Sequence, residues 1–394
     1  MPAPNDSTPK HQLCNPTTTD GIRSLPPEIV LQILSYLSFG DLLAFGATCS
    51  SNHGYHIASV KGLRLGVFEK RVHSIISLLQ AGWASPDQLA VWGNNGQDFS
   101  YMISVVLPQN KLAKRDSYRV QSCHSTSTRR RSQGYDRPRS QEHMIRVQNQ
   151  IVTRVLGRYG AALRSLEFMA YDLDMEGATA LGTRCQHTLR HLALRFEHPH
   201  IRDGLMRPST WLQPAPGNEA WNSLIGVGGN CKGDGLQYLD TLILERAGIT
   251  SWQLMMLVKR NPNLKTLKLR TCRGARSDFL YWLGGIKDEF EESETQMGEP
   301  APGAKLEVLW LEHCHRILPH PVEENKDFPD EMCDSGFEWV RGLNGLRSLS
   351  FSESTNIPSE LVDRANKTIW KVPEVILPYS LYGSSAIAVD PRWK

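Results

Sequence analysis

A recurring leucine pattern constrains the fold of this 394-residue chain more than any other feature. The pattern LxxLxL occurs four times in strict form, with starts at Leu189, Leu239, Leu264 and Leu306. Relaxed matches that allow Val or Phe start at Val60, Leu163, Leu346 and Val372. Several steps between starts are 25 or 26 residues (163 to 189, 239 to 264, 346 to 372), which indicates a repeated structural unit.

Helix-like segments lie between these strand patterns. Residues 250–263 have a capping Thr250 or Ser251 at one end and Asn261-Pro262 as a stop at the other. The apolar face expected there is Trp252, Met255, Met256 and Leu257. Similar helices are expected over 144–156, 277–290 and 357–366. The sequence therefore predicts alternating strands and helices, and hence an α/β fold.

Each strand–helix unit can bury its apolar side only against its neighbours. We therefore predict an irregular leucine-rich-repeat solenoid, with parallel strands on the concave face and helices outside. A doubly wound α/β domain would show the same alternation of elements. It would not require LxxLxL at a fixed period, and no Gly-rich phosphate loop follows a predicted strand.

Residues 25–49 are too apolar for a solvated N-terminal segment. Leu25, Ile29, Ile33, Leu34 and Leu37 recur at helical spacing after a Leu-Pro-Pro-Glu start. Phe39 and Gly40 are expected to break this helix, and Asp41 to cap a second helix that contains Leu42, Leu43 and Phe45. About 25 residues cannot bury this apolar surface alone. The segment is either a hairpin docked on the chain's own core or a docking module completed by a partner.

This segment resembles the F-box, the motif by which substrate receptors join SCF-type cullin–RING ubiquitin ligases. The match runs without gaps through Leu25-Pro26, Glu28-Ile29, Ile33-Leu34, Tyr36-Leu37, Asp41-Leu42-Leu43 and Cys49. Phe39 stands where the family often has Pro, and Asn52 stands where it often has Trp. The resemblance assigns adaptor binding to Leu25, Pro26, Glu28, Ile29, Ile33, Leu34, Leu37, Asp41, Leu42, Leu43 and Cys49.

The whole chain resembles the fungal proteins that join an F-box to leucine-rich repeats. The resemblance implies that the F-box binds a Skp-family adaptor and, through it, a cullin. The repeat region would bind an unknown protein substrate, and the chain itself would not be an enzyme. Two alternatives remain: an F-box scaffold that acts outside a ligase, and a divergent α/β enzyme.

Composition divides the chain into folded and charged segments. Between Lys111 and Arg139, nine Lys or Arg face two Asp, whereas 287–299 and 323–334 each carry six acids and one Lys. The expected organisation is a disordered N-terminus (1–21), the F-box (22–58), a first strand–helix segment (59–110), a disordered basic linker (111–140) and the repeat region (141–394). Insertions in the repeat region are expected near 198–235, 287–303 and 320–335.

Several classes of protein do not fit the composition. The net charge of +3 does not suggest a nucleic-acid partner, and no run of about 18 apolar residues suggests a membrane span. The eight cysteines include no CxxC pair, and no secretory leader is recognisable. Reduced thiols and a cytoplasmic or nuclear location are therefore expected.

The motifs that could carry chemistry have structural explanations. His313, Cys314, His315 and His320 invite a metal interpretation. However, Cys272 and Cys314 each stand three residues after the last leucine of a repeat, where an inward-pointing side chain satisfies the loop backbone. No GxSxG, HExxH or phosphate-binding loop is present. We expect no catalytic residues, no metal and no cofactor.

Overall fold

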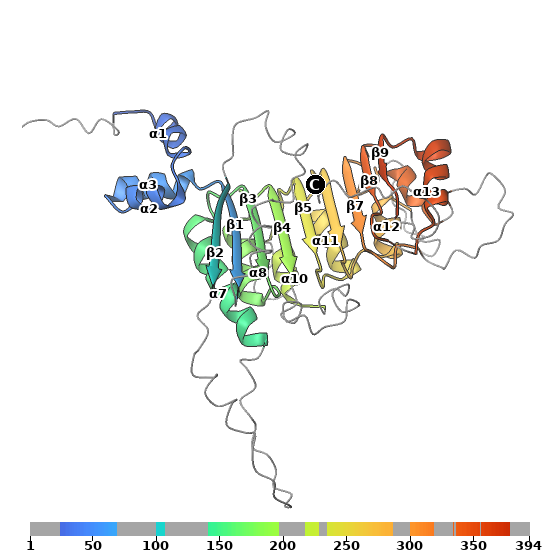
Figure 1. The fold of residues 1–394 in the computed structure, drawn as a ribbon, viewed down its shortest axis with the longest axis horizontal. Helices are drawn as coiled ribbons and strands as arrows, with labels where there is room; N and C mark the ends of the chain where they lie inside the picture. Colours follow the sequence, from blue (N-terminus) through green and yellow to red (C-terminus); the bar gives the residue numbers. More distant parts are fainter. Residues whose placement is uncertain are drawn as a thin grey trace, which may run out of the picture. The chain divides into compact units, whose positions relative to one another are not determined.

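The computed structural model describes residues 24–68, 100–106, 141–196, 217–227, 235–286, 300–318, 334, 336–354 and 356–378 (Figure 1). It divides into two compact units, with the boundary between Ser59 and Val60. The predictions for 1–21, for the basic linker at 111–140 and for the acidic stretches at 287–299 and 323–333 lie outside the described residues.

The first unit consists of three short helices, α1 (Pro27–Leu34), α2 (Phe39–Gly46) and α3 (Ser50–Ser59). Proline opens α1, as predicted, because its missing N–H would lack a helical partner at that position. The prediction for the start of α2 was wrong. Phe39 and Gly40 belong to the helix, and the Ser38 side chain is the cap that accepts a hydrogen bond from the Asp41 backbone N–H at 3.2 Å.

Helix α3 was not predicted, because its sequence is polar and has no apolar periodicity. It packs against both α1 and α2. His56 of α3 is fully buried, and a methyl group at position 46 would come within 2.5 Å of its ring. Gly46 therefore lets α2 and α3 approach closely.

The second unit is an α/β domain built on one parallel sheet of nine described strands, in the order β2-β1-β3-β4-β5-β6-β7-β8-β9. The strands are β1 (Gly62–Phe68), β2 (Ser100–Val106), β3 (Ser165–Ala170), β4 (His191–Phe196), β5 (Thr241–Glu245), β6 (Thr266–Arg270), β7 (Val308–Glu312), β8 (Ser348–Ser350) and β9 (Glu374–Ile376). All eight leucine-pattern matches fall on or beside a strand, so the predicted strands are confirmed. Strand β2 was missed because it lacks the pattern; it pairs outside β1.

The leucines of the pattern form continuous rows across the sheet. One row joins Leu63, Leu166, Leu192, Leu242, Leu267, Leu309, Leu349 and Val375 in consecutive register. The seven leucines of this row are at most 1% exposed. Slippage of any strand by one residue would turn its leucines to the other face, so this row fixes the register.

From β2 onward, a helix or a short helical turn lies between each strand and the next along the chain (Figure 1). They are α7 (Gln141–Tyr159), α8 (Met175–Arg184), α10 (Ala220–Ile225), α11 (Ser251–Arg260), α12 (Ser277–Leu283) and α13 (Ser359–Ala365), with the short turns η4 (Glu338–Gly342) and η5 (Asn366–Trp370). The predicted cap of α11 is confirmed: Thr250 and Gln253 form a reciprocal capping box. The predicted apolar face was wrong in part, since Trp252 is 53% exposed and Leu254 is buried instead.

The turns after three consecutive strands share one hydrogen bond, in which a small side chain donates to a backbone carbonyl of the preceding strand. The donors are Cys272, Cys314 and Ser354, and the acceptors are the carbonyl oxygens of Leu244, Leu269 and Leu311, at 3.2, 3.7 and 3.0 Å. The residue before each donor has a positive φ: Thr271, His313 and Glu353. The predicted structural role of Cys272 and Cys314 is therefore confirmed.

Candidate functional site

The first unit exposes apolar side chains on its first helix and the turn that follows it. Ile29, Ile33 and Tyr36 are 42%, 49% and 67% exposed. Their spacing of four and then three residues aligns them on one side of the helix. Leu43 of α2 is also exposed. We call these four residues the apolar stripe.

The opposite side of α1 carries buried apolar side chains. Val30 and Leu34 are buried, together with Leu42 of α2. These residues form the interior of the small helical unit, so the unit has a core of its own. Large apolar side chains that remain exposed beside a formed core are typical of a protein–protein interface.

The structure divides the predicted adaptor-binding residues into three groups. Pro26, Glu28, Ile29, Ile33, Asp41 and Leu43 are exposed, Leu25, Leu37 and Cys49 are half-buried, and Leu34 and Leu42 are buried. Because Leu34 and Leu42 are in the interior, they can support a contact surface but do not form it. Tyr36 was part of the motif match but was not predicted as a site residue. Its spacing from Ile29 and Ile33 was the available signal.

Local hydrogen bonds at the starts of α2 and α3 involve the polar residues of the motif. The Ser38 hydroxyl donates to Asp41 Oδ2 at 2.6 Å, and Asn52 Nδ2 donates to the Thr48 hydroxyl at 2.8 Å. Asp41 therefore stabilises the first turn of α2, where a negative charge is favourable. Asn52, at the position of the family's frequent Trp, makes a local hydrogen bond.

In the second unit, charged side chains lie on the sheet face opposite the leucine rows. Arg64 pairs with Glu167 at 3.1 Å, and Arg195 pairs with Glu245 at 2.5 Å, across neighbouring strands. Burial raises the pKa of Glu167, while Arg64 and Arg195 act in the opposite direction. These charges largely neutralise one another within the chain. Farther along the same face, Lys268 Nζ lies 3.4 Å from the centre of the Trp310 ring.

Buried thiols of the second unit lack the properties of catalytic nucleophiles. Burial raises the pKa of both Cys185 and Cys314 to about 12, and it also raises the pKa of Cys272. A nucleophilic cysteine requires the thiolate, which is favoured by a lowered pKa. These three residues are therefore structural, which removes the described buried thiols from the enzyme alternative.

The histidines flagged by the sequence lie against each other rather than around a metal position. The rings of His313 and His315 meet edge to face at 4.3 Å, and burial together with His315 lowers the pKa of His313. His320 lies outside the described residues. Within the described ranges, no three His, Cys, Asp or Glu side chains are grouped so that they could hold a metal ion. None of the helices in the described part is long and apolar enough to span a membrane.

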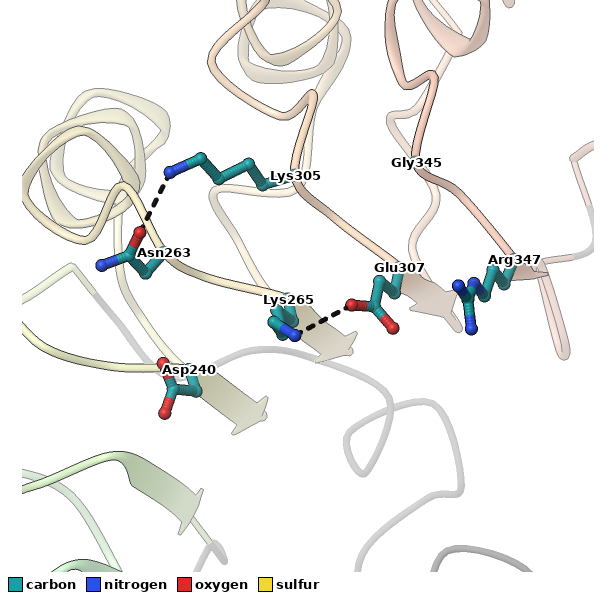
Figure 2. Close-up of a pocket in the computed structure, with 7 residues that line it drawn as sticks. All are labelled: Asp240, Asn263, Lys265, Lys305, Glu307, Gly345 and Arg347. Carbon is teal, nitrogen blue, oxygen red and sulfur yellow. Dashed lines mark hydrogen bonds and ion pairs between the residues drawn. The ribbon is translucent and has the colours of Figure 1, made fainter. Parts of the chain in front are cut away.

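A pocket of about 500 Å³ lies at the amino ends of strands β5 to β8 (Figure 2). Asp240, Lys265, Glu307 and Arg347 each immediately precede one of these strands and alternate in charge. Lys265 pairs with Glu307 at 3.2 Å, and Lys305 Nζ donates to Asn263 Oδ1 at 3.0 Å. Lys265 and Glu307 thus neutralise each other, and the lining residues do not form a convergent catalytic group.

Comparison with known proteins bears on the helical unit. No match was found among curated proteins. Residues 22–53 match the family model described as F-box-like, and this range contains α1, α2 and the apolar stripe. The chain therefore carries an F-box-like domain at its N-terminal helical unit, followed by an α/β region with a parallel sheet.

Proposed function

We propose that this protein is the substrate-recognition subunit of an SCF-type ubiquitin ligase. The observation that carries the proposal is the apolar stripe, which lies on the F-box-like domain and is exposed although the domain has its own core. F-box domains generally bind Skp-family adaptors. In this proposal Ile29, Ile33, Tyr36 and Leu43 supply the apolar centre of that contact, and Leu34 and Leu42 hold the helices in place.

We further propose that the second unit is an irregular leucine-rich-repeat solenoid that receives the substrate. The in-register leucine row supports this architecture, and so does the turn hydrogen bond shared by Cys272, Cys314 and Ser354. Repeats that bury their apolar sides against their neighbours leave an extended surface for a partner. The chain would then connect two proteins without performing chemistry itself.

The catalytic advantage of such a subunit is proximity. An adaptor bound at one unit and a substrate bound at the other would place a substrate lysine near the ubiquitin-loaded enzyme. Holding two reactants together replaces a bimolecular encounter with an effectively intramolecular one. Activity would therefore depend on both binding surfaces of this chain.

The adaptor contact is tested with the double variant Ile29→Ala/Ile33→Ala. Each side chain is about half exposed in the free unit, so its further burial in a complex contributes about 1 kcal/mol. The double variant should weaken binding of a recombinant Skp-family adaptor by more than tenfold in calorimetry. Trp252→Ala is the matched control, because it removes an equally exposed apolar side chain from α11.

Unchanged adaptor affinity in the folded double variant would contradict the adaptor assignment. Reconstitution with a cullin–RING module separates a ligase subunit from a scaffold. The proposal expects the adaptor complex to recruit the cullin, whereas a scaffold acting outside a ligase would bind the adaptor and exclude the cullin.

A further inference from the structure

The amino ends of the first strands of the second unit carry a group of basic side chains. Lys61, Arg164 and Arg190 immediately precede β1, β3 and β4, while Arg158 and Arg184 lie in the last turns of α7 and α8. We call these five residues the basic rim. The segments that contain them, 59–62, 156–164 and 182–191, include no Asp or Glu.

Backbone hydrogen bonds place the three strand-preceding residues side by side. The backbone N–H groups of Arg164 and Ser165 donate to the Lys61 carbonyl at 2.7 and 3.0 Å. Those of Arg190 and His191 donate to the Arg164 carbonyl at 2.8 and 3.0 Å. The three side chains therefore start about 4.8 Å apart, the spacing of neighbouring strands.

The ends of the two helices adjoin the same edge. The Thr188 hydroxyl donates to the Gly160 carbonyl at 3.0 Å, and a methyl group at position 160 would come within 2.8 Å of Arg184 Cβ. The turn after α7 is therefore in contact with the end of α8. This contact brings Arg158 and Arg184 to the edge at which Arg164 and Arg190 begin their strands.

Helix dipoles account for only part of this charge. Arg158 and Arg184 are in the last turns of helices, where a cation offsets the negative end of the dipole. Lys61, Arg164 and Arg190 precede strands, whose sheets have only small net dipoles. Like charges at neighbouring register positions repel one another, so a bound anion would stabilise this arrangement.

Two arginines of the rim are already held in place by aromatic rings. Arg190 Nη1 donates to the Tyr238 carbonyl at 3.1 Å, and its guanidinium lies 5.0 Å from the centre of the Tyr238 ring. The guanidinium of Arg158 lies 5.5 Å from the centre of the Tyr159 ring. Such contacts reduce the conformational entropy that a charged side chain loses on binding.

The positive charge ends at the next strand, because Asp240, whose backbone N–H donates to the Arg190 carbonyl at 2.8 Å, follows Arg190 along this edge. Before β5 to β8 the equivalent residues are Asp240, Lys265, Glu307 and Arg347, which alternate in sign, and Lys265 pairs with Glu307 (Figure 2). The charges on the sheet face opposite the leucine rows are also used internally, in the Arg64–Glu167 and Arg195–Glu245 pairs.

We propose that the basic rim binds a carboxylate-rich segment of the substrate protein, an inference that rests on the proposed role of the second unit in substrate recognition. Four of the five residues are arginines, whose planar guanidinium matches a carboxylate with two parallel hydrogen bonds. The three strand starts span only about 10 Å. Duplex DNA presents one charge per about 1.7 Å and favours a longer basic track, so a short acidic peptide fits this rim better.

The test uses the full chain and a fluorescein-labelled peptide of about 12 residues in which Glu and Ser alternate. Binding is measured by fluorescence anisotropy at about 0.15 M salt, where charges within about 8 Å still interact. The double reversal Arg164→Glu/Arg190→Glu should weaken peptide binding at least tenfold. The control Lys305→Glu/Arg347→Glu makes the same change in net charge on the same edge and should weaken binding less than threefold.

Three results would overturn the proposal: no binding of the peptide, an equal loss in both double variants, or tighter rim-dependent binding of a short oligonucleotide or of phosphatidylserine vesicles. If the reversal variant fails to fold, Arg164→Gln/Arg190→Gln replaces it, with Lys305→Gln/Arg347→Gln as control. Adaptor affinity is measured on the same samples. If a rim variant loses peptide binding but keeps its adaptor affinity, the change is limited to the basic rim. If the wild-type chain does not bind the adaptor, the proposed function is contradicted.

Discussion

Replacement of Ser354 by Ala tests whether the shared turn hydrogen bond stabilises the stack of strands. The Ser354 hydroxyl donates to the Leu311 carbonyl at 3.0 Å and accepts from the Cys314 backbone N–H at 3.2 Å. Ser354 is fully buried, so in the folded protein water cannot take the place of its hydroxyl group. The alanine variant would leave one buried donor and one buried acceptor without this partner.

Each buried polar group that loses its partner costs about 1–3 kcal/mol. The two groups together should therefore lower the free energy of unfolding by about 2–6 kcal/mol, which urea denaturation followed by circular dichroism can resolve. Ser354→Cys should recover part of the loss, because Cys272 and Cys314 make the equivalent donation in the turns after the two preceding strands.

Thr183→Ala provides the control for loss of a hydroxyl. Its side chain donates to the Thr179 carbonyl at 2.8 Å, but on the exposed surface of α8, where water can take its place. The expected change is within about 0.5 kcal/mol. A Ser354→Ala variant as stable as Thr183→Ala would contradict the role of this turn contact in holding neighbouring strands together.

Three further changes test the core and the buried titratable groups. Leu267→Ala should cost about 2–5 kcal/mol, and hydrogen exchange should show protection lost first in β5 and β7, the neighbours of β6. Burial raises the pKa of Asp172 to about 6, so the folded state binds the extra proton between about pH 4 and 6 and loses stability as the pH rises. Asp172→Asn should therefore raise the free energy of unfolding at pH 7 by roughly 1–2 kcal/mol, and no gain would contradict this assignment. Burial, Arg64 and Lys268 lower the pKa of His191 to about 4, so stability should fall as the pH drops from about 6.5 to 4, and His191→Asn should flatten this slope in urea titrations.

Most strands of the sheet were predictable because a leucine occupies the same buried register position in successive strands. Leu192, Leu242, Leu267, Leu309 and Leu349 are the second leucines of the pattern, and all are at most 1% exposed. The capping box of α11 was equally local, since Thr250 and its neighbours determine it. Local patterns of this kind can be recognised without knowing which distant residues are in contact.

Elements that are stabilised mainly by tertiary contacts were not predicted from the sequence. Strand β2 has no leucine pattern, and only its pairing with β1 reveals its place at the edge. Helix α3 is polar, and it is held by the close approach of Gly46 to His56. The division of the F-box-like residues into exposed and buried sets was also hidden. Ile33 and Leu34 are neighbours in the motif, yet one is 49% exposed and the other 3%.

The charges of the second unit show why binding residues could not be chosen from the polarity of strand positions. Arg64, Glu167, Arg195 and Glu245 occupy the positions that would point at a bound partner, but they pair across the strands instead. A charge that already has an internal partner must break that contact before it can bind another group. In the basic rim, by contrast, backbone pairing brings together cations that are distant in sequence, and the segments that carry them contain no acid. Recognition of a partner by charge is therefore expected at the edge of the sheet rather than at its centre.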